Sequence, residues 1–170
     1  LSLASVTDKG CCFSIDLPRV AAVRKVEPVK APHVELSGTT VLCVDDDEDV
    51  LAGMVEMLST WDCEVLAADN VVSAEAMFEQ HKFNIDIVLV DYQLSEKDNG
   101  IALVESLRTM TNVYLPAILI SATTDEDIAE KTAAADIGYM RKMVKPAALR
   151  AMISAKLSDK LHRQYVGEQV

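Results

Sequence analysis

The chain has 170 residues, of which half are hydrophobic and a quarter are charged, a composition typical of one globular domain with additional segments. The formal net charge of −11 argues against binding to nucleic acid or an anionic membrane, because phosphate groups attract basic proteins, and favours a cation or a basic partner. No apolar run approaches the roughly 18 residues of a membrane-spanning helix, and residues 1–7 lack the features of a signal peptide.

Residues 1–18 form a first segment, in which two short strand-like pieces flank the turn sequence Asp8-Lys9-Gly10. We therefore expect a β-hairpin that ends at Pro18. Residues 19–38 contain prolines, scattered charge and no sustained period, so they predict a linker. Because the first residue is Leu rather than Met, we expect the chain to be a piece of a longer protein.

From residue 39 onward, short apolar runs alternate with segments of helical periodicity, and we assign residues 39–157 to one domain. The apolar runs predict strands at Thr40–Val44, Glu64–Ala67, Asp86–Val90, Ala117–Ile120 and Gly138–Arg141. The segments between them predict helices entered near Asp47, Val72, Asn99-Gly100, Thr124-Asp125 and Pro146. Five βα units imply a doubly wound parallel sheet with helices on both faces. Residues 158–170 are interpreted as a helical tail that frays.

The four cysteines show no zinc-ligand spacing. Cys11 and Cys12 are adjacent, and Cys43 lies within a predicted strand. The simplest interpretation is that all four cysteines, including Cys63, are reduced in a cytoplasmic protein.

Polar side chains follow the predicted strands where the strands end, and ligands of parallel sheets bind at that edge. The acidic run Asp45-Asp46-Asp47-Glu48-Asp49 follows the first strand, Asp91 the third and Ser121 the fourth, while Lys142 and Lys145 lie at the end of the fifth. Each feature alone has an ordinary explanation, since an acidic residue suits a helix N-cap, a lone Asp suits a turn and a lone Lys is usually solvated. Because all of them meet at one edge, we predict a joint site.

Electrostatics predicts a cation at this edge. Two carboxylates about 4 Å apart repel by about 4 kcal/mol at an effective dielectric near 20, so Asp45, Asp46 and Asp91 need a positive partner. Mg²⁺ prefers such oxygen ligands. A carboxylate that attacks phosphorus forms an acyl phosphate, and a metal ion with a nearby ammonium neutralises charge on the transferring group. A Ser hydroxyl at the same edge can donate to a phosphoryl oxygen.

These residues, in this order, resemble the receiver domain of two-component response regulators. The resemblance rests on three stretches, residues 41–46, 87–91 and 118–122, and it spans about residues 39–157. It implies a flavodoxin-like (βα)5 fold with strand order 2-1-3-4-5. The loop after Asp91 departs from the family, because Ser95-Glu96-Lys97-Asp98 replaces a Met-Pro-type loop and is one residue longer. Metal affinity or the dephosphorylation rate is expected to differ accordingly.

The resemblance also implies roles for individual residues. Asp91 would be the phosphoacceptor, and Mg²⁺ would bind to Asp46, to Asp91 and to the backbone carbonyl of Gln93. Asp45 would act on the metal through water. Ser121 would be the switch hydroxyl that approaches the phosphate.

The lysine is the ambiguous position. The family has a Lys-Pro dipeptide at the end of the fifth strand, three residues after an aromatic switch residue. Lys145-Pro146 supplies the dipeptide, but Lys142 follows Tyr139 at the family's spacing. We assign the phosphate-pairing role to Lys142, with Lys145 as the alternative, and the switch role to Tyr139. Met143 then replaces the usual proline, which argues against a cis peptide bond there.

The first segment carries a second resemblance. The stretch from Asp8 to Pro18 is similar to the last hairpin of a histidine-kinase ATP-binding domain, with an ordinary surface hairpin as the alternative. Residues 1–18 would then be the end of that domain, and the parent a hybrid sensor histidine kinase with this receiver at its C-terminus. The sequence lacks the kinase's nucleotide-binding glycine boxes, so we do not expect ATP binding. The three histidines, His33, His81 and His162, have no phosphoacceptor context.

Two other functions compete with this interpretation. An aspartyl phosphatase of the haloacid-dehalogenase class uses Asp-x-Asp, then Ser, then Lys, an order that Asp45, Asp47, Ser121 and Lys142 match loosely. That reading leaves Asp91 unexplained. The third reading is a pseudo-receiver that only binds partners and is not phosphorylated.

The receiver resemblance implies a phosphohistidine domain as donor, on the parent chain or on another protein, with a histidine phosphotransfer protein as a further candidate. Phosphorylation would move Ser121 and Tyr139 and change the face built by the fourth helix, fifth strand and fifth helix. The same face is a candidate homodimer interface. We expect no nucleic acid and no membrane contact by this segment, so any membrane anchor of the parent would lie elsewhere.

Overall fold

The computed structural model describes residues 2–6, 10–14, 35–81, 84–95, 97–111, 113–123 and 126–167. The chain divides into two compact units, residues 1–30 and residues 31–170, and each is described by itself. Most of the predicted linker, and the turn residues Asp8 and Lys9, lie outside the described residues.

The first unit contains a β-hairpin, as the sequence predicts. Strand β1 (Ser2–Val6) pairs antiparallel with β2 (Gly10–Ser14), and Val6 lies opposite Gly10 next to the turn. Gly10 has a φ of +92°, which glycine adopts without the steric cost that a side chain would add. The expected continuation of the hairpin to Pro18 falls outside the described residues.

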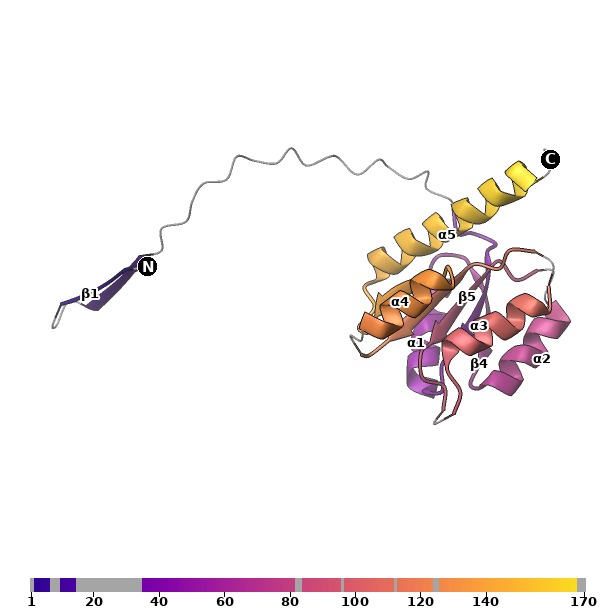
Figure 1. The fold of residues 1–170 in the computed structure, drawn as a ribbon, viewed down its shortest axis with the longest axis horizontal. Coiled ribbons are helices and arrows are strands. Elements are labelled where there is room, and N and C mark those ends of the chain that lie inside the picture. Colours follow the sequence, from indigo (N-terminus) through magenta and orange to yellow (C-terminus); the bar gives the residue numbers. More distant parts are fainter. Residues whose placement is uncertain are drawn as a thin grey trace. The chain divides into compact units, whose positions relative to one another are not determined.

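The second unit is built on a five-stranded parallel sheet. Its strands are β3 (Thr40–Val44), β4 (Glu64–Ala68), β5 (Ile87–Asp91), β6 (Ala117–Ser121) and β7 (Gly138–Arg141). They lie in the order β4-β3-β5-β6-β7, which is the expected 2-1-3-4-5 order within this unit. In Figure 1 the sheet lies among the helices of this unit. Every residue of β3, β5 and β6 is buried, which explains why these strands read as continuous apolar runs.

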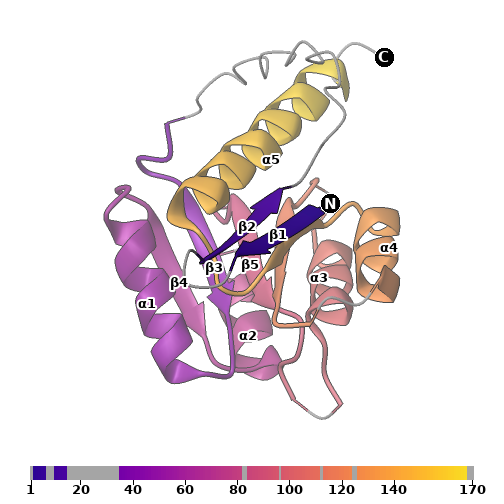
Figure 2. The same cartoon turned by 90° about the vertical axis from the view of Figure 1, so that its left-hand side faces the viewer.

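Five helices cover the two faces of the sheet (Figure 2). They are α1 (Glu48–Ser59), α2 (Val71–His81), α3 (Gly100–Thr109), α4 (Glu126–Ala134) and α5 (Pro146–Gly167). Leu58 of α1 and Ile153 of α5 pack in one core cluster with Val41, whereas Phe78 of α2 and Val104 of α3 pack in the other. Alternate strand residues point to opposite faces, so each strand contributes to both clusters. The described helices include none that is long and apolar enough to cross a membrane.

Two helices begin at the caps expected from the sequence. The Asp47 carboxylate accepts hydrogen bonds from the amides of Asp49 and Val50 at the start of α1. The Asn99 side chain accepts a hydrogen bond from the amide of Ala102 at the start of α3. Such caps satisfy amides that have no partner inside the helix. The predicted cap of α4 at residues 124 and 125 lies outside the described residues.

Helix α5 continues through Gly167, past the boundary at residue 158 where we expect a fraying tail. Two side chains on this extension form ion pairs with the rest of the domain. Lys160 Nζ lies 3.0 Å from Asp86 Oδ1, and Arg163 Nη2 lies 2.7 Å from Asp136 Oδ2. These pairs explain why the helix is longer than its apolar pattern indicates.

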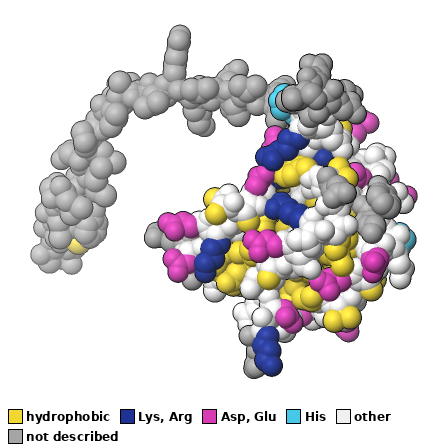
Figure 3. Space-filling model, turned by 45° about the vertical axis from the view of Figure 1, so that its right-hand side comes forward, with side chains coloured by type: hydrophobic (Ala, Val, Ile, Leu, Met, Phe, Trp, Pro, Cys, Tyr) yellow, Lys and Arg dark blue, Asp and Glu magenta, His cyan; other side chains and the backbone are white. Residues whose placement is uncertain are grey.

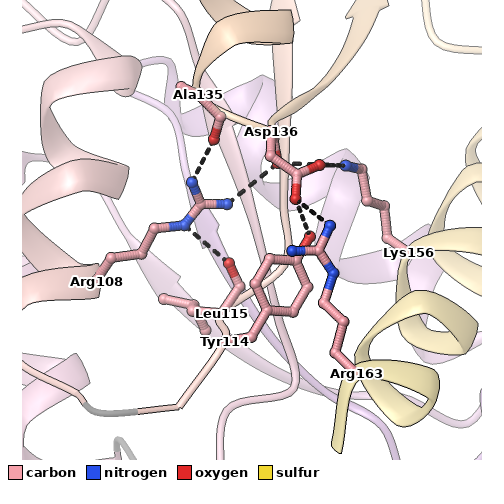
Figure 4. Close-up of polar contacts among 7 residues, drawn as sticks. All are labelled: Arg108, Tyr114, Leu115, Ala135, Asp136, Lys156 and Arg163. Carbon is pink, nitrogen blue, oxygen red and sulfur yellow. Dashed lines mark hydrogen bonds and ion pairs between the residues drawn. The ribbon is translucent and has the colours of Figure 1, made fainter. Parts of the chain in front are cut away.

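Asp136 is the centre of a polar network that joins α3, α5 and the start of β7 (Figure 4). Its carboxylate accepts from the Tyr114 hydroxyl at 3.0 Å and from Lys156 Nζ at 3.0 Å, in addition to Arg163. Arg108 donates to the backbone carbonyls of Leu115, Ala135 and Asp136. The network therefore satisfies the carbonyls that follow α4 and ties α5 to them.

We expect Asp136→Asn to lower the stability of the domain at neutral pH by about 1 kcal/mol, the scale of partly exposed ion pairs. Partial burial opposes ionisation of Asp136, but hydrogen bonds from Lys156 and Tyr114, with the charges of Lys156 and Arg163, outweigh it and lower its pKa. Asn keeps the residue's tolerance of its φ of +52°.

Folding lowers the pKa of Asp136, so the ionised carboxylate stabilises the folded domain. This stabilisation is fully present above the unfolded-state pKa of about 3.9 and is lost as the pH falls below that value. Urea unfolding of the wild type and of Asp136→Asn, measured between pH 7 and pH 3, gives the free energy of unfolding of each. The difference between the two free energies should shrink in acid. Asp159→Asn, the same chemical change at an exposed position of α5, is the control. A difference that persists unchanged at pH 3 would contradict the electrostatic explanation.

One face of the domain mixes its charges. On the face shown in Figure 3, Lys and Arg side chains are interspersed with acidic and hydrophobic ones, and they do not gather into one patch.

Candidate phosphoryl-transfer site

The predicted site residues meet at the carboxyl ends of the parallel strands. Asp45 and Asp91 are buried there, with exposed fractions of 6% and 7%. Ser121 ends β6 and is 2% exposed. A cleft of about 400 Å³ opens at this edge, and its lining includes Asp46, Asp91, Gln93, Ser121 and Lys142.

Lys142 bonds to two buried carboxylates. Its Nζ lies 3.0 Å from Asp45 Oδ2 and 2.6 Å from Asp91 Oδ1. Lys145 instead is exposed, and its carbonyl accepts hydrogen bonds from the amides of Ala148 and Leu149 in the first turn of α5. Of the two candidate lysines, the structure brings Lys142 to the carboxylates.

The peptide bond after this lysine corrects one expectation. The absence of proline at residue 143 argues for a trans bond, but the Lys142–Met143 bond is cis. The Lys142 amide donates to the Ser121 carbonyl at 2.8 Å, so the residue is also held to the end of β6 through its backbone.

Burial and charge shift the ionisation of this group of residues. Burial raises the pKa of Asp45, although the hydrogen bonds from Lys142 and from the Asp47 amide oppose the shift. Burial acts to lower the pKa of Lys142, but hydrogen bonds to Asp91 and Asp45 and the charges of both carboxylates outweigh it and raise that pKa. The ammonium is therefore the stable form, and it supplies a positive charge at the point where the carboxylates converge.

Backbone amides hold the two carboxylates in place. The Asp47 amide donates to Asp45 Oδ1 at 3.1 Å, and the Gln93 amide donates to Asp91 Oδ2 at 2.8 Å. Gly100 packs so closely that a Cβ there would collide with the backbone oxygen of Asp91. A glycine at this position therefore allows α3 to begin directly against the strand that carries Asp91.

The loop after Asp91 is an ordered turn in its described part. Gln93 and Asn99 form an antiparallel bridge across its base. The Ser95 hydroxyl donates to Asp98 Oδ2 at 2.9 Å and accepts from the amides of Lys97 and Asp98. These hydrogen bonds stabilise the described part of the loop.

Ser121 and Tyr139, the two expected switch residues, both bond to Thr123. The hydroxyls of Ser121 and Thr123 lie 3.0 Å apart, and the Thr123 amide donates to Ser121 Oγ at 3.2 Å. The Tyr139 hydroxyl donates to the Thr123 carbonyl at 2.7 Å. Thr123 was not among the predicted site residues, although a second hydroxyl two residues after Ser121 was a signal for it.

The donor set suits a hard cation such as Mg²⁺. Asp46, Asp91 and Gln93 line the cleft, and Lys142 joins the Asp45 carboxylate to that of Asp91. Within the described ranges no three His, Cys, Asp or Glu side chains gather closely enough to hold a metal ion by themselves. Mg²⁺ does not need such a cage, because it binds through one or two carboxylates and keeps several waters. The residues present fit that pattern.

Other predicted features lie apart from this group. The Asp47 carboxylate bonds to the amides of α1, where it caps the helix, and does not join Asp45 in an Asp-x-Asp pair. His81 and His162 are exposed on helices, and His33 is outside the described residues. Cys43 and Cys63 are free and buried, and Cys11 is exposed.

The family model described as Response regulator receiver domain matches residues 41–155 of this chain. Sensor protein TorS of Escherichia coli is 27% identical over 158 residues, which cover 91% of this chain and 17% of that protein. Sensor kinase CckA of Brucella abortus is 29% identical over 170 residues, with 94% and 17% coverage. This chain therefore spans under a fifth of either relative.

The fold is also similar to solved structures. A chain of the CheX-CheY-BeF3-Mg complex from Borrelia burgdorferi superposes with a TM-score of 0.61 at 22% identity, over 68% of this chain and 88% of that one. At that identity the likeness concerns the fold, which agrees with the doubly wound sheet described above.

Proposed function

The chain belongs to the response regulator receiver domain family, and from this premise we propose that it accepts a phosphoryl group on Asp91 in a Mg²⁺-dependent phosphorelay. The observation that carries the proposal is the contact of one ammonium, Lys142, with two buried carboxylates beside an open cleft. Of these two carboxylates, that of Asp91 bonds to Lys142 and also lines the cleft.

In the proposed reaction an oxygen of Asp91 attacks the phosphorus of a phosphohistidine. The new P–O bond forms as the P–N bond breaks, and the imidazole nitrogen keeps the electron pair of that bond. The Gln93 amide and Lys142 hold the Asp91 carboxylate in a fixed orientation, which lowers the entropic cost of reaching the attack geometry. The Lys142 ammonium also neutralises charge on the transferring group.

Asp46, Asp91 and the Gln93 carbonyl would hold Mg²⁺, with Asp45 acting through water. When bound, the ion would offset the negative charge that a phosphoryl group brings to a cluster of carboxylates. The Borrelia burgdorferi complex contains Mg and BeF3 on the same fold, which supports a metal of this kind here.

The similarity to two sensor kinases supports a hybrid histidine kinase as the parent. Their alignments cover 91% and 94% of this chain, so both include part of the segment before residue 41, where the family match begins. On this proposal residues 1–18 are the end of the kinase's ATP-binding domain and residues 39–157 are the receiver. The donor would be a phosphohistidine of the parent chain or of a histidine phosphotransfer protein, in the cytoplasm.

The proposed output is a change in the face built by α4, β7 and α5, which is also the candidate homodimer interface. Tyr139 of β7 connects this face to the site through Thr123. The phosphatase alternative loses its support, because the Asp47 carboxylate caps α1. The pseudo-receiver alternative stays open as an outcome of the test.

The test is intact-mass spectrometry of the chain after incubation with acetyl phosphate, with Mg²⁺ or with EDTA. We expect one added phosphoryl group in the sample with Mg²⁺ and none in the sample with EDTA. If acetyl phosphate fails, a phosphorylated histidine phosphotransfer domain serves as the donor. An unmodified chain with both donors would contradict the proposed function and favour a pseudo-receiver.

A further inference from the structure

Thr123 lies between the two expected switch residues and bonds to both through different atoms. Its hydroxyl and amide contact the Ser121 hydroxyl, and its carbonyl accepts from the Tyr139 hydroxyl. Thr123 is exposed at the mouth of the cleft, whereas Ser121 is buried. Thr123 thus connects Ser121, the hydroxyl expected to approach the phosphate, with Tyr139, the aromatic residue expected to move in response.

The direction of the bond between the two hydroxyls follows from burial. Ser121 Oγ accepts from the Thr123 amide, which leaves its own proton and one further acceptor position to be satisfied. Thr123 Oγ1 is the side-chain acceptor that the described contacts offer, at 3.0 Å. The exposed Thr123 hydroxyl can give its proton to water, but a buried Ser121 proton without an acceptor would carry a desolvation penalty. The 3.0 Å contact itself fits either direction, and burial favours Ser121 as the donor.

This arrangement competes with the role proposed for Ser121. A phosphoryl group on Asp91 would need the Ser121 proton for one of its oxygens, and Ser121 has one proton to give. The register places Asp91 opposite Ile120, so Ser121 follows directly on the neighbouring strand, and both line the cleft. The bond from Ser121 to Thr123 must break before Ser121 can donate to the phosphoryl group.

We propose that Thr123 is a positioning residue that holds the Ser121 hydroxyl in the unphosphorylated domain and releases it to the phosphoryl group. The proposal rests on the proposed phosphoacceptor function. Because the Thr123 carbonyl also accepts from Tyr139, release of Ser121 is transmitted to Tyr139 through the same residue. The contact with Thr123 therefore opposes the phosphorylated state and sets how readily it forms.

The test uses Thr123→Val, which keeps the shape of the side chain and removes the hydroxyl. We expect this variant to bind beryllofluoride with Mg²⁺ about 2- to 10-fold more tightly than the wild type, since a competing hydrogen bond is gone. Thr123→Ser keeps the hydroxyl and should restore wild-type affinity. Thr109→Val is the matched control, because it removes an exposed hydroxyl that bonds to Ser106 in α3.

A second measurement does not depend on phosphorylation. NMR of the free domain should show a Ser121 hydroxyl proton that is protected from exchange in the wild type and in Thr123→Ser, and unprotected in Thr123→Val. Unchanged or weaker beryllofluoride affinity in Thr123→Val, or a Ser121 proton still protected there, would overturn the proposal. If the wild type binds no beryllofluoride, the proposed function fails, and the exchange measurement still decides whether Thr123 holds the Ser121 proton.

Discussion

Asp91→Asn should abolish phosphorylation of this domain. The substitution keeps the size of the side chain and an oxygen that can accept from the Gln93 amide. It removes the carboxylate that would attack phosphorus and one of the two anionic partners of Lys142. No other carboxylate combines burial, contact with the lysine and a place on the cleft wall, among the residues described. We therefore expect loss of the reaction and not merely a slower one.

Intact-mass spectrometry with acetyl phosphate and Mg²⁺ checks this result. Asp159→Asn makes the same chemical change on the exposed part of α5 and should be phosphorylated as the wild type is. Circular dichroism of each variant separates a lost acceptor from a lost fold. A phosphoryl group that persists in Asp91→Asn and maps to Asp45 or Asp46 would move the acceptor to that residue.

Lys142→Met should slow phosphorylation by about 10- to 100-fold. The substitution removes the ammonium that bonds to Asp45 and Asp91. The expected slowing corresponds to the loss of one bond to a charged group in the transition state, about 1.5–3 kcal/mol. It also leaves two buried carboxylates without the cation that lies between them. Met preserves the length of the apolar stem, so packing changes little.

Lys145→Met is the matched control, because Lys145 is exposed and three residues along the chain. Its rate should stay within about twofold of the wild type, as expected for a solvated charge. Single-turnover rates with acetyl phosphate, measured at saturating Mg²⁺, provide the comparison. The reverse pattern, a slow Lys145 variant and a normal Lys142 variant, would assign the phosphate-pairing role to Lys145.

The amino-acid sequence alone was enough to predict the elements of the fold and the residues available for the site. Apolar runs in the sequence predicted the buried strands, because a strand covered on both faces contains few polar residues. Their predicted ends differ from the observed ones by one residue at most. The polar residues Asp91, Ser121 and Lys142 stood out because each follows such a run. The N-terminal hairpin was predicted by its turn, a local feature.

The tertiary structure decided which of these residues touch. Spacing allowed both Lys142 and Lys145, and the contact with Asp45 and Asp91 separates them. The contacts of Thr123 with Ser121 and Tyr139 could not be predicted from the sequence. The same holds for the polar network around Asp136. Local patterns record whether a residue is buried and in which element it lies, because burial and backbone hydrogen bonding repeat with the period of that element. Contacts between distant segments depend on how the strands align and how the helices pack, and no short stretch of sequence contains that information.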